Sequence, residues 1–356
     1  MKMKKILSSV LAAMLCMTAF TACSDGNSST ASDDSANASF DVSSSGENSS
    51  SSEESGNSTD NTAANPEMNV VALKGPTAMG LTKLMSDNET ENYGYNFDIV
   101  AAPDEVTTMV ANGSVDIACI PANLGSVLYN KTEGKVQALA INTLGVLYIC
   151  ENGDTVKSIE DLKGKTIFSS GKGSTPEYAL NFVLDKSGIA NDVSVEWKSE
   201  HAECLQALLT TENSVALLPQ PFVTTAQMKN EGVRVALDLN DEWNKVESSG
   251  ALLTGIAIVR REYAQQYPDA VKQFLTRYNA SVEYVNANVD DAAALVGKYE
   301  IVTEAVAKKA IPECNIVCIT GDEMKTKLSG YLDVLFSSEA KSVGGKVPAE
   351  DFYFVG

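Results

Sequence analysis

Two similar stretches, each running from a strand-like segment into the start of a helix, constrain the fold of this chain most. In the first, residues 73–81, Gly75 allows a tight turn, Pro76 presets a helical φ angle and Thr77 is placed to cap the helix. The second, residues 171–178, again sets glycines, hydroxyl groups and a proline at a helix start. Backbone N–H groups at a helix start lack intrahelical partners and bind polar or anionic atoms. One such segment alone is typical of a turn, but two of them on two α/β units predict one ligand held between two lobes.

Residues 1–22 have the composition of an export signal rather than of a folded segment. Lys2, Lys4 and Lys5 form a basic start, and the apolar stretch at 6–20 is too short for a transmembrane helix. Small residues then precede Cys23. This pattern resembles a bacterial lipoprotein signal peptide, which implies that Cys23 becomes the lipidated first residue of the mature chain. Cys16 is the weaker candidate for that position.

The segment that follows Cys23 is polar and acidic. Residues 24–67 contain no Lys or Arg, and Phe40 is their one aromatic residue. Such a Ser-rich segment buries too little apolar surface to fold. We therefore predict that residues 23–67 are a lipid anchor and a disordered tether, which places the protein outside the cytoplasm on the cell membrane. The formal net charge of −20 argues against nucleic acid as a partner.

The positions of the seven cysteines in the sequence do not indicate a disulfide framework. Cys119, Cys150 and Cys204 lie singly in apolar surroundings, which is typical of small buried side chains. Cys314 and Cys318 are close enough in sequence to form a bridge. Cys318 falls in a strand-like run, however, which argues against a bridge and leaves the state of this pair open.

The rest of the chain alternates strand-like and helical segments and therefore indicates an α/β fold. Apolar runs at 136–141 and 145–150 lead out of a first lobe, and a run at 252–259 leads back to it. The predicted boundaries are 68–147 plus 251–356 for lobe 1 and 148–250 for lobe 2.

Two of the predicted strands end in segments suited to binding a ligand. The apolar run 115–120 is followed by Pro121 and Asn123, and the run 215–218 is followed by Gln220 and Pro221. Ligands of open α/β sheets lie beyond the carboxyl ends of strands. On these residues alone, a rigid turn at 219–222 is as good an interpretation as a binding loop.

Capping motifs and the spacing of apolar residues predict several helices. Ser158 with Asp161 and Thr320 with Glu323 have the spacing of capping boxes. The apolar residues between 271 and 285 recur at helical spacing, which predicts core packing rather than a cofactor site.

Residues 68–356 resemble the substrate-binding proteins of ABC importers of the nitrate, taurine and aliphatic sulfonate class, which includes binders of thiamine pyrimidine precursors. The likeness rests on 162–178, on 115–123 and on 218–222. It implies a two-lobed, type II periplasmic-binding-protein fold with the ligand in a cleft between lobes that close over it. It also implies that the ligand is bound by Pro76, Thr77, Ala78, Pro121, Asn123, Ser174, Thr175, Gln220 and Pro221.

Enzymatic chemistry has little support in this sequence. His201 is the single histidine, and it could touch Cys204, but a histidine at a helix end is usually solvated and a nucleophile needs a third, orienting group. One histidine and scattered cysteines give no metal-ligand spacing, and 171–174 lacks the spacing of a phosphate-binding loop. We expect no catalytic residues, no metal and no cofactor.

The sequence therefore favours an extracytoplasmic binding protein that captures a small organic solute and delivers it to the permease and ATPase subunits of an importer. A sulfonate-like, pyrimidine-like or aromatic solute fits the resemblance, and we expect a monomer that recognises it mainly through neutral donors. Two alternatives stay open: a diverged enzyme of the same fold, and a lipoprotein that senses a ligand and signals through a membrane partner.

Overall fold

The computed structural model describes residues 66–247 and 251–355. The predicted signal peptide, Cys23 and nearly all of the predicted tether lie outside these residues. Within them, no helix combines the length and the apolar character needed to cross a membrane.

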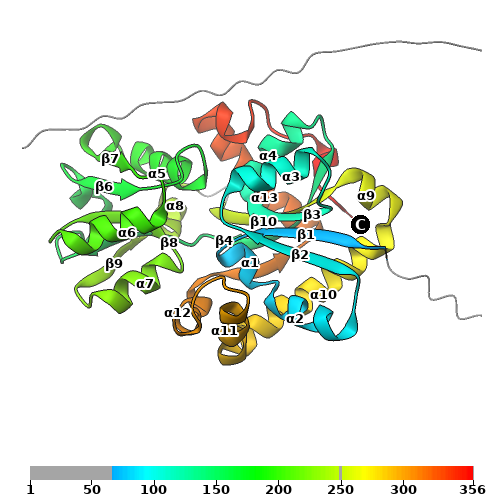
Figure 1. Ribbon diagram of the computed structural model, residues 1–356. Coiled ribbons are helices and arrows are strands. Elements are labelled where there is room, and N and C mark those ends of the chain that lie inside the picture. Colours follow the sequence, from blue (N-terminus) through cyan, green and yellow to red (C-terminus); the bar gives the residue numbers. More distant parts are fainter. Residues whose placement is uncertain (1–65, 248–250, 356) are drawn as a thin grey trace, which may run out of the picture. The chain divides into compact units, whose positions relative to one another are not determined.

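The first of two sheets has six strands and draws on both ends of the described chain (Figure 1). Its order is β11-β4-β10-β3-β1-β2. β1 is parallel to β2 and β3, whereas β10 runs antiparallel to β3 and β4. The strands are β1 (Met68–Leu73), β2 (Tyr95–Val100), β3 (Ile117–Pro121), β4 (Val136–Leu144), β10 (Leu253–Arg260) and β11 (Ile316–Ile319).

The second sheet has five strands from the middle of the chain, in the order β7-β6-β8-β5-β9. β6 is parallel to β7 and β8, and β5 is antiparallel to β8 and β9. The strands are β5 (Leu147–Asn152), β6 (Thr166–Ser169), β7 (Ser194–Trp197), β8 (Val215–Pro219) and β9 (Val233–Asp238). We call the six-stranded sheet with its helices lobe 1 and the five-stranded sheet with its helices lobe 2.

Helices connect the strands and cover the sheets. Lobe 1 carries α1 (Pro76–Met79), α2 (Thr82–Glu91), α3 (Pro103–Ala111), α4 (Ala122–Lys131), α9 (Arg261–Gln266), α10 (Pro268–Ala287), α11 (Val289–Lys298), α12 (Glu304–Ala310) and α13 (Gly321–Ser338). Lobe 2 carries α5 (Thr175–Lys186), α6 (His201–Thr210), α7 (Phe222–Lys229) and α8 (Leu239–Val246). Five short 3₁₀ turns lie among the described residues, at Ile159–Leu162, Ala190–Asp192, Ile311–Glu313, Ala340–Val343 and Glu350–Phe352.

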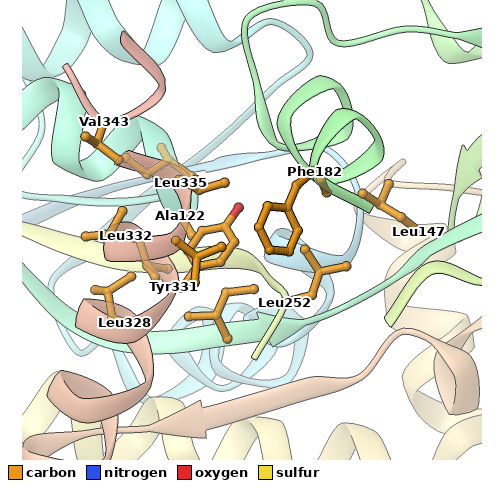
Figure 2. Close-up of a cluster of buried hydrophobic side chains, with 14 of the residues drawn as sticks. Ala122, Leu147, Phe182, Leu252, Leu328, Tyr331, Leu332, Leu335 and Val343 are labelled. Atoms are coloured by element: carbon orange, nitrogen blue, oxygen red, sulfur yellow. The ribbon is translucent and has the colours of Figure 1, made fainter. Parts of the chain in front are cut away.

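The apolar core is divided into three clusters of buried side chains. One lies in lobe 1 around α10, and a small one lies in lobe 2 around α6 and α7. The largest cluster contains residues of both lobes, among them Phe182 and Trp243 of lobe 2 and Tyr331 of α13. Figure 2 shows Phe182, Leu252 and Tyr331 gathered in this cluster. The two lobes therefore share an apolar contact that includes residues of α5 and α13.

Local capping differs in part from the prediction. The capping box of Ser158 and Asp161 is present and opens a 3₁₀ turn. Thr320 is the N-cap of α13, but its side chain makes no capping hydrogen bond, so the second predicted box is absent. The N-cap of α1 is Gly75 rather than Thr77, because the turn there needs a φ of 134°, which glycine alone adopts without strain.

Cys119, Cys150, Cys204, Cys314 and Cys318 are all free thiols. The pair that the sequence left open is therefore not bridged. Burial raises the pKa of the Cys119 and Cys150 thiols to about 12, so these side chains stay protonated and apolar in character.

Candidate functional site

The predicted site residues all occur where a strand gives way to a helix. Pro76, Thr77 and Ala78 form most of α1, directly after β1. Pro121 ends β3, and Ser174 is the N-cap of α5. The carboxyl ends of β1 and β3 meet at one edge of the first sheet because these strands are parallel.

Asn123 and Thr175 are brought together across the two lobes. The Thr175 hydroxyl donates to Asn123 Oδ1 at 3.3 Å, and Tyr331 of α13 donates its hydroxyl to Thr175 Oγ1 at 3.3 Å. Asn123 Nδ2 donates to the Ser342 carbonyl at 3.1 Å. Both Asn123 and Thr175 are 2% exposed. This buried network joins the start of α4, the start of α5 and the middle of α13, so it ties the predicted binding loops of the two lobes to each other.

Thr77 uses its hydroxyl inside lobe 1. The Thr77 hydroxyl donates to the Leu73 carbonyl at 2.7 Å, and the side chain is buried. Gly255 of β10 lies directly beneath it, since a Cβ there would stand 2.6 Å from Thr77 Cγ2 and 2.4 Å from Asn142 Oδ1. The missing side chain at Gly255 thus lets α1 lie close against the sheet.

Ser174 also uses its hydroxyl locally, because it donates to the Gly171 carbonyl at 2.7 Å and closes the loop before α5. Lys74 and Lys172, which flank the two loops, are exposed. The hydroxyl groups of Thr77 and Ser174, which were predicted to bind the ligand, therefore already donate to backbone carbonyls of their own loops.

Gln220 lines a cavity of about 390 Å³ that is separate from the Asn123–Thr175 contact. Its Oε1 atom accepts from the Thr224 hydroxyl at 2.9 Å and from the Thr224 backbone N–H at 3.3 Å, which fixes the orientation of the amide. The cavity is lined by Tyr148, Gln220, Val223, Thr224, Gln227, Met228, Val235, Lys309 and Glu313. Lys309 and Glu313 come from lobe 1 and were not among the site residues predicted from the sequence.

His201 is placed differently from the sequence interpretation, which took it for a solvated side chain. The imidazole is half-buried rather than exposed, its Nδ1 lies 2.6 Å from the Ser170 hydroxyl, and its ring packs against Phe222 at 5.2 Å. Burial lowers the pKa of His201 to about 4, so the ring is neutral at physiological pH. His201 therefore contacts Ser170, just before the loop that begins at Gly171, and Phe222, just after the Gln220–Pro221 loop. The signal for this placement was its position at the helix start just after β7.

The surroundings of Cys204 do not activate it as a nucleophile. Burial raises the pKa of this thiol, although a hydrogen bond from Ser170 partly offsets the effect. Over the two described ranges, no group of three His, Cys, Asp or Glu side chains is arranged to hold a metal ion.

Two α/β sheets, linked where β4 passes into β5 and where the chain returns to β10, define the class of periplasmic-binding-protein folds. Residues 92–292 match the family described as NMT1/THI5 like, which is more than half of the chain. The protein belongs to this family. A curated relative from Brucella abortus, named as a candidate binding protein, is 23% identical over 245 residues, covering 65% of this chain and 75% of the relative.

Solved structures with the same fold include proteins of ABC transporters. An ABC transporter protein from Parabacteroides distasonis has 22% identity and a TM-score of 0.68, covering 81% of this chain and 98% of its own. The periplasmic aliphatic sulphonate binding protein of Escherichia coli has 17% identity and a TM-score of 0.66, covering 81% of this chain and 92% of its own. At these identities the likeness establishes the fold, which agrees with the two-lobed fold expected from the sequence.

Proposed function

We propose that this protein is the extracytoplasmic substrate-binding component of an ABC importer. In this proposal it captures a small organic solute between its lobes and delivers it to a permease with its ATPase. The observation that carries the proposal is the buried Thr175–Asn123 hydrogen bond, because it places the helix starts of two separate α/β lobes against each other. A two-lobed protein with such a contact is suited to close on a ligand and open again.

The family supports the same function. Its structural relatives include the aliphatic sulphonate binding protein of Escherichia coli and the alkanesulfonate-binding protein of Xanthomonas axonopodis, which was solved with MOPS bound. A sulfonate-like, pyrimidine-like or aromatic solute is the range that the family suggests for this chain. The lobe boundaries at 147/148 and 250/251, the lipidated Cys23 and the monomeric state are parts of the same proposal.

A diverged enzyme is the alternative that one observation favours, namely the short contact between Ser170 and His201. A hydroxyl beside a neutral imidazole resembles part of a nucleophile–base pair. Incubation of the protein with each solute that binds, followed by mass spectrometry of the solute, separates the two functions. Unchanged solute supports a binding protein, and a product would establish an enzyme.

The function itself is tested by a thermal-shift screen against sulfonates, pyrimidines and aromatic acids. A solute that binds the native state raises the unfolding temperature by mass action. Small-angle scattering of the protein with that solute should then show a smaller radius of gyration, as expected for lobe closure. A radius that stays constant at saturating solute would show that the lobes do not close.

A further inference from the structure

The cavity lined by Gln220 lies between the two lobes, because residues of both lobes line it. Seven of its lining residues belong to lobe 2, on β5, β8–α7 and β9, whereas Lys309 of α12 and Glu313 of the following 3₁₀ turn belong to lobe 1. Its volume of about 390 Å³ lies within the range of small-molecule sites. A molecule in this cavity would contact both lobes.

The buried end of the cavity offers one oriented neutral donor. Gln220 is 4% exposed, and Thr224 occupies its Oε1 atom. Among the described residues, no acceptor is bonded to the Nε2 group of Gln220. Gln220 lines the cavity, so its Nε2 group is available to donate to an acceptor atom of a ligand there.

Lobe 1 contributes one cationic and one anionic side chain to the cavity, Lys309 and Glu313. Lys309 and Glu313 are both exposed, and neither forms an ion pair within the described part of the chain. Their neighbour Lys308, by contrast, pairs with Asp290 at 2.7 Å. The ammonium of Lys309 and the carboxylate of Glu313 are thus both available to a ligand.

Tyr148 adds evidence that the Glu313 side of the cavity is electronegative. The Tyr148 hydroxyl donates to the Glu313 backbone carbonyl at 3.3 Å, which holds the 3₁₀ turn of lobe 1 against β5 of lobe 2. The pKa of Tyr148 is raised well above its ordinary value, first by burial and then by the negative charges of Asp238 and Glu313. A cationic group placed there would be stabilised by the same two carboxylates.

We propose that this cavity binds a small zwitterion of amino-acid size, with its anionic group at Gln220 Nε2 and Lys309 and its ammonium group at Glu313. This inference rests on the proposed function, since it makes the zwitterion the solute that the binding protein captures. It narrows the solute to a molecule that carries both charges. Such a ligand bridges the lobes because its anionic end meets Gln220 of lobe 2, while Lys309 and Glu313 of lobe 1 hold its two charges.

The test uses the full-length chain in detergent and a panel of glycine, β-alanine, 4-aminobutyrate and L-serine. Propionate and propylamine, which each carry one charge, are the matched controls for β-alanine. We expect at least one zwitterion to raise the unfolding temperature and to give a measurable Kd by calorimetry. The single-charge compounds should not do so at the same concentration.

Variants then locate the binding. Lys309→Gln and Glu313→Gln should each weaken binding of the zwitterion about tenfold, as expected for the loss of one charge-assisted hydrogen bond. Gln220→Glu keeps an acceptor for Thr224 but replaces the amide donor by a carboxylate, so it should weaken binding at least as much. Lys308→Gln and Glu304→Gln change exposed charges of the same helix that do not line the cavity, and binding should be unchanged. Lys309 and Glu313 are exposed, so their variants should unfold at the wild-type temperature without ligand.

The proposal is overturned if no zwitterion binds, or if binding is equal in the Lys309→Gln, Glu313→Gln and wild-type proteins. If a sulfonate, a pyrimidine or an aromatic acid binds equally to all three proteins, the importer function stands and the zwitterion site is wrong. If no compound of either panel binds, the proposed function fails together with this inference.

Discussion

The hydroxyl of Thr175 donates to the side-chain oxygen of Asn123 across 52 positions of sequence, and the two residues belong to different lobes. The bond is buried, and it is continued by Tyr331, whose own hydroxyl donates to Thr175. Because Asn123 lies at the start of α4, Thr175 at the start of α5 and Tyr331 within α13, the network links helices of both lobes.

Thr175→Val tests this network. The variant keeps the shape of the side chain but removes the acceptor of the Tyr331 hydroxyl and the donor to Asn123. Unfolding in urea should show a loss of about 1–3 kcal/mol, since buried polar groups lose their partners. Ser174→Ala, which removes only a half-buried hydroxyl bonded to the Gly171 carbonyl, should cost no more than about 1 kcal/mol. Equal losses for the two variants would show that the network between the lobes contributes nothing specific.

Gly255→Ala should displace α1. A methyl group at this position would stand 2.4 Å from Asn142 Oδ1 and 2.6 Å from Thr77 Cγ2, so α1 or the sheet must move. Overpacking of this kind costs about 1–3 kcal/mol, which thermal unfolding measures. Wild-type stability of the variant would mean that α1 is loosely held.

Arg234→Met should destabilise lobe 2 strongly. Arg234 NH2 lies 2.7 Å from the Glu151 carboxylate, whose side chain is fully buried, and the loss of Arg234 leaves that charge with the more distant Lys165 ammonium, at 4.0 Å, as its cationic partner. Removal of one partner of a buried ion pair lowers the free energy of unfolding by about 3–5 kcal/mol. Lys157→Met removes an exposed ion pair with Asp154 and should cost less than about 1 kcal/mol. Urea unfolding of both variants checks the contrast, and similar midpoints would contradict it.

His201 should make the protein less stable in mild acid. Its pKa is about 4 in the folded protein, below the ordinary value of 6.5, so the unfolded chain binds the proton more tightly. The stability that His201 contributes is therefore complete above pH 6.5 and is lost as the pH falls from there toward 4. His201→Asn, which keeps a polar partner for Ser170, should remove this part of the acid dependence, on the order of 1–3 kcal/mol between pH 7 and pH 4. Parallel pH profiles for wild type and variant would show that the ring is not buried as a neutral group.

Cys23 and the segment after it should matter for location rather than for binding. Cys23→Ser should release the protein from the membrane fraction of the cell, because we propose this thiol as the site that carries the acyl chains. Deletion of residues 24–67 should leave the calorimetric Kd for a solute unchanged. A fall in affinity after the deletion would mean that this segment takes part in the site.

Local rules were sufficient for much of the architecture. The apolar runs before Pro121 and Pro219 became β3 and β8, and the glycine–proline loops became the starts of α1 and α5, because each depends on neighbouring residues alone. The return of the chain to the first sheet at 253–260 was also visible in the sequence, as an apolar run after a long excursion.

Tertiary packing decided which of these pieces meet. The sequence placed Asn123, Thr175 and Gln220 in one site, but the structure joins the first two in a buried network with Tyr331 and puts Gln220 in a cavity with Lys309 and Glu313. Neither α13 nor α12 carries a local signal for these contacts, because their place is set by apolar packing against helices far away in the chain. The partial burial of His201 arose in the same way, since its ring at the start of α6 is shielded from solvent by the ring of Phe222, which a later part of the chain supplies.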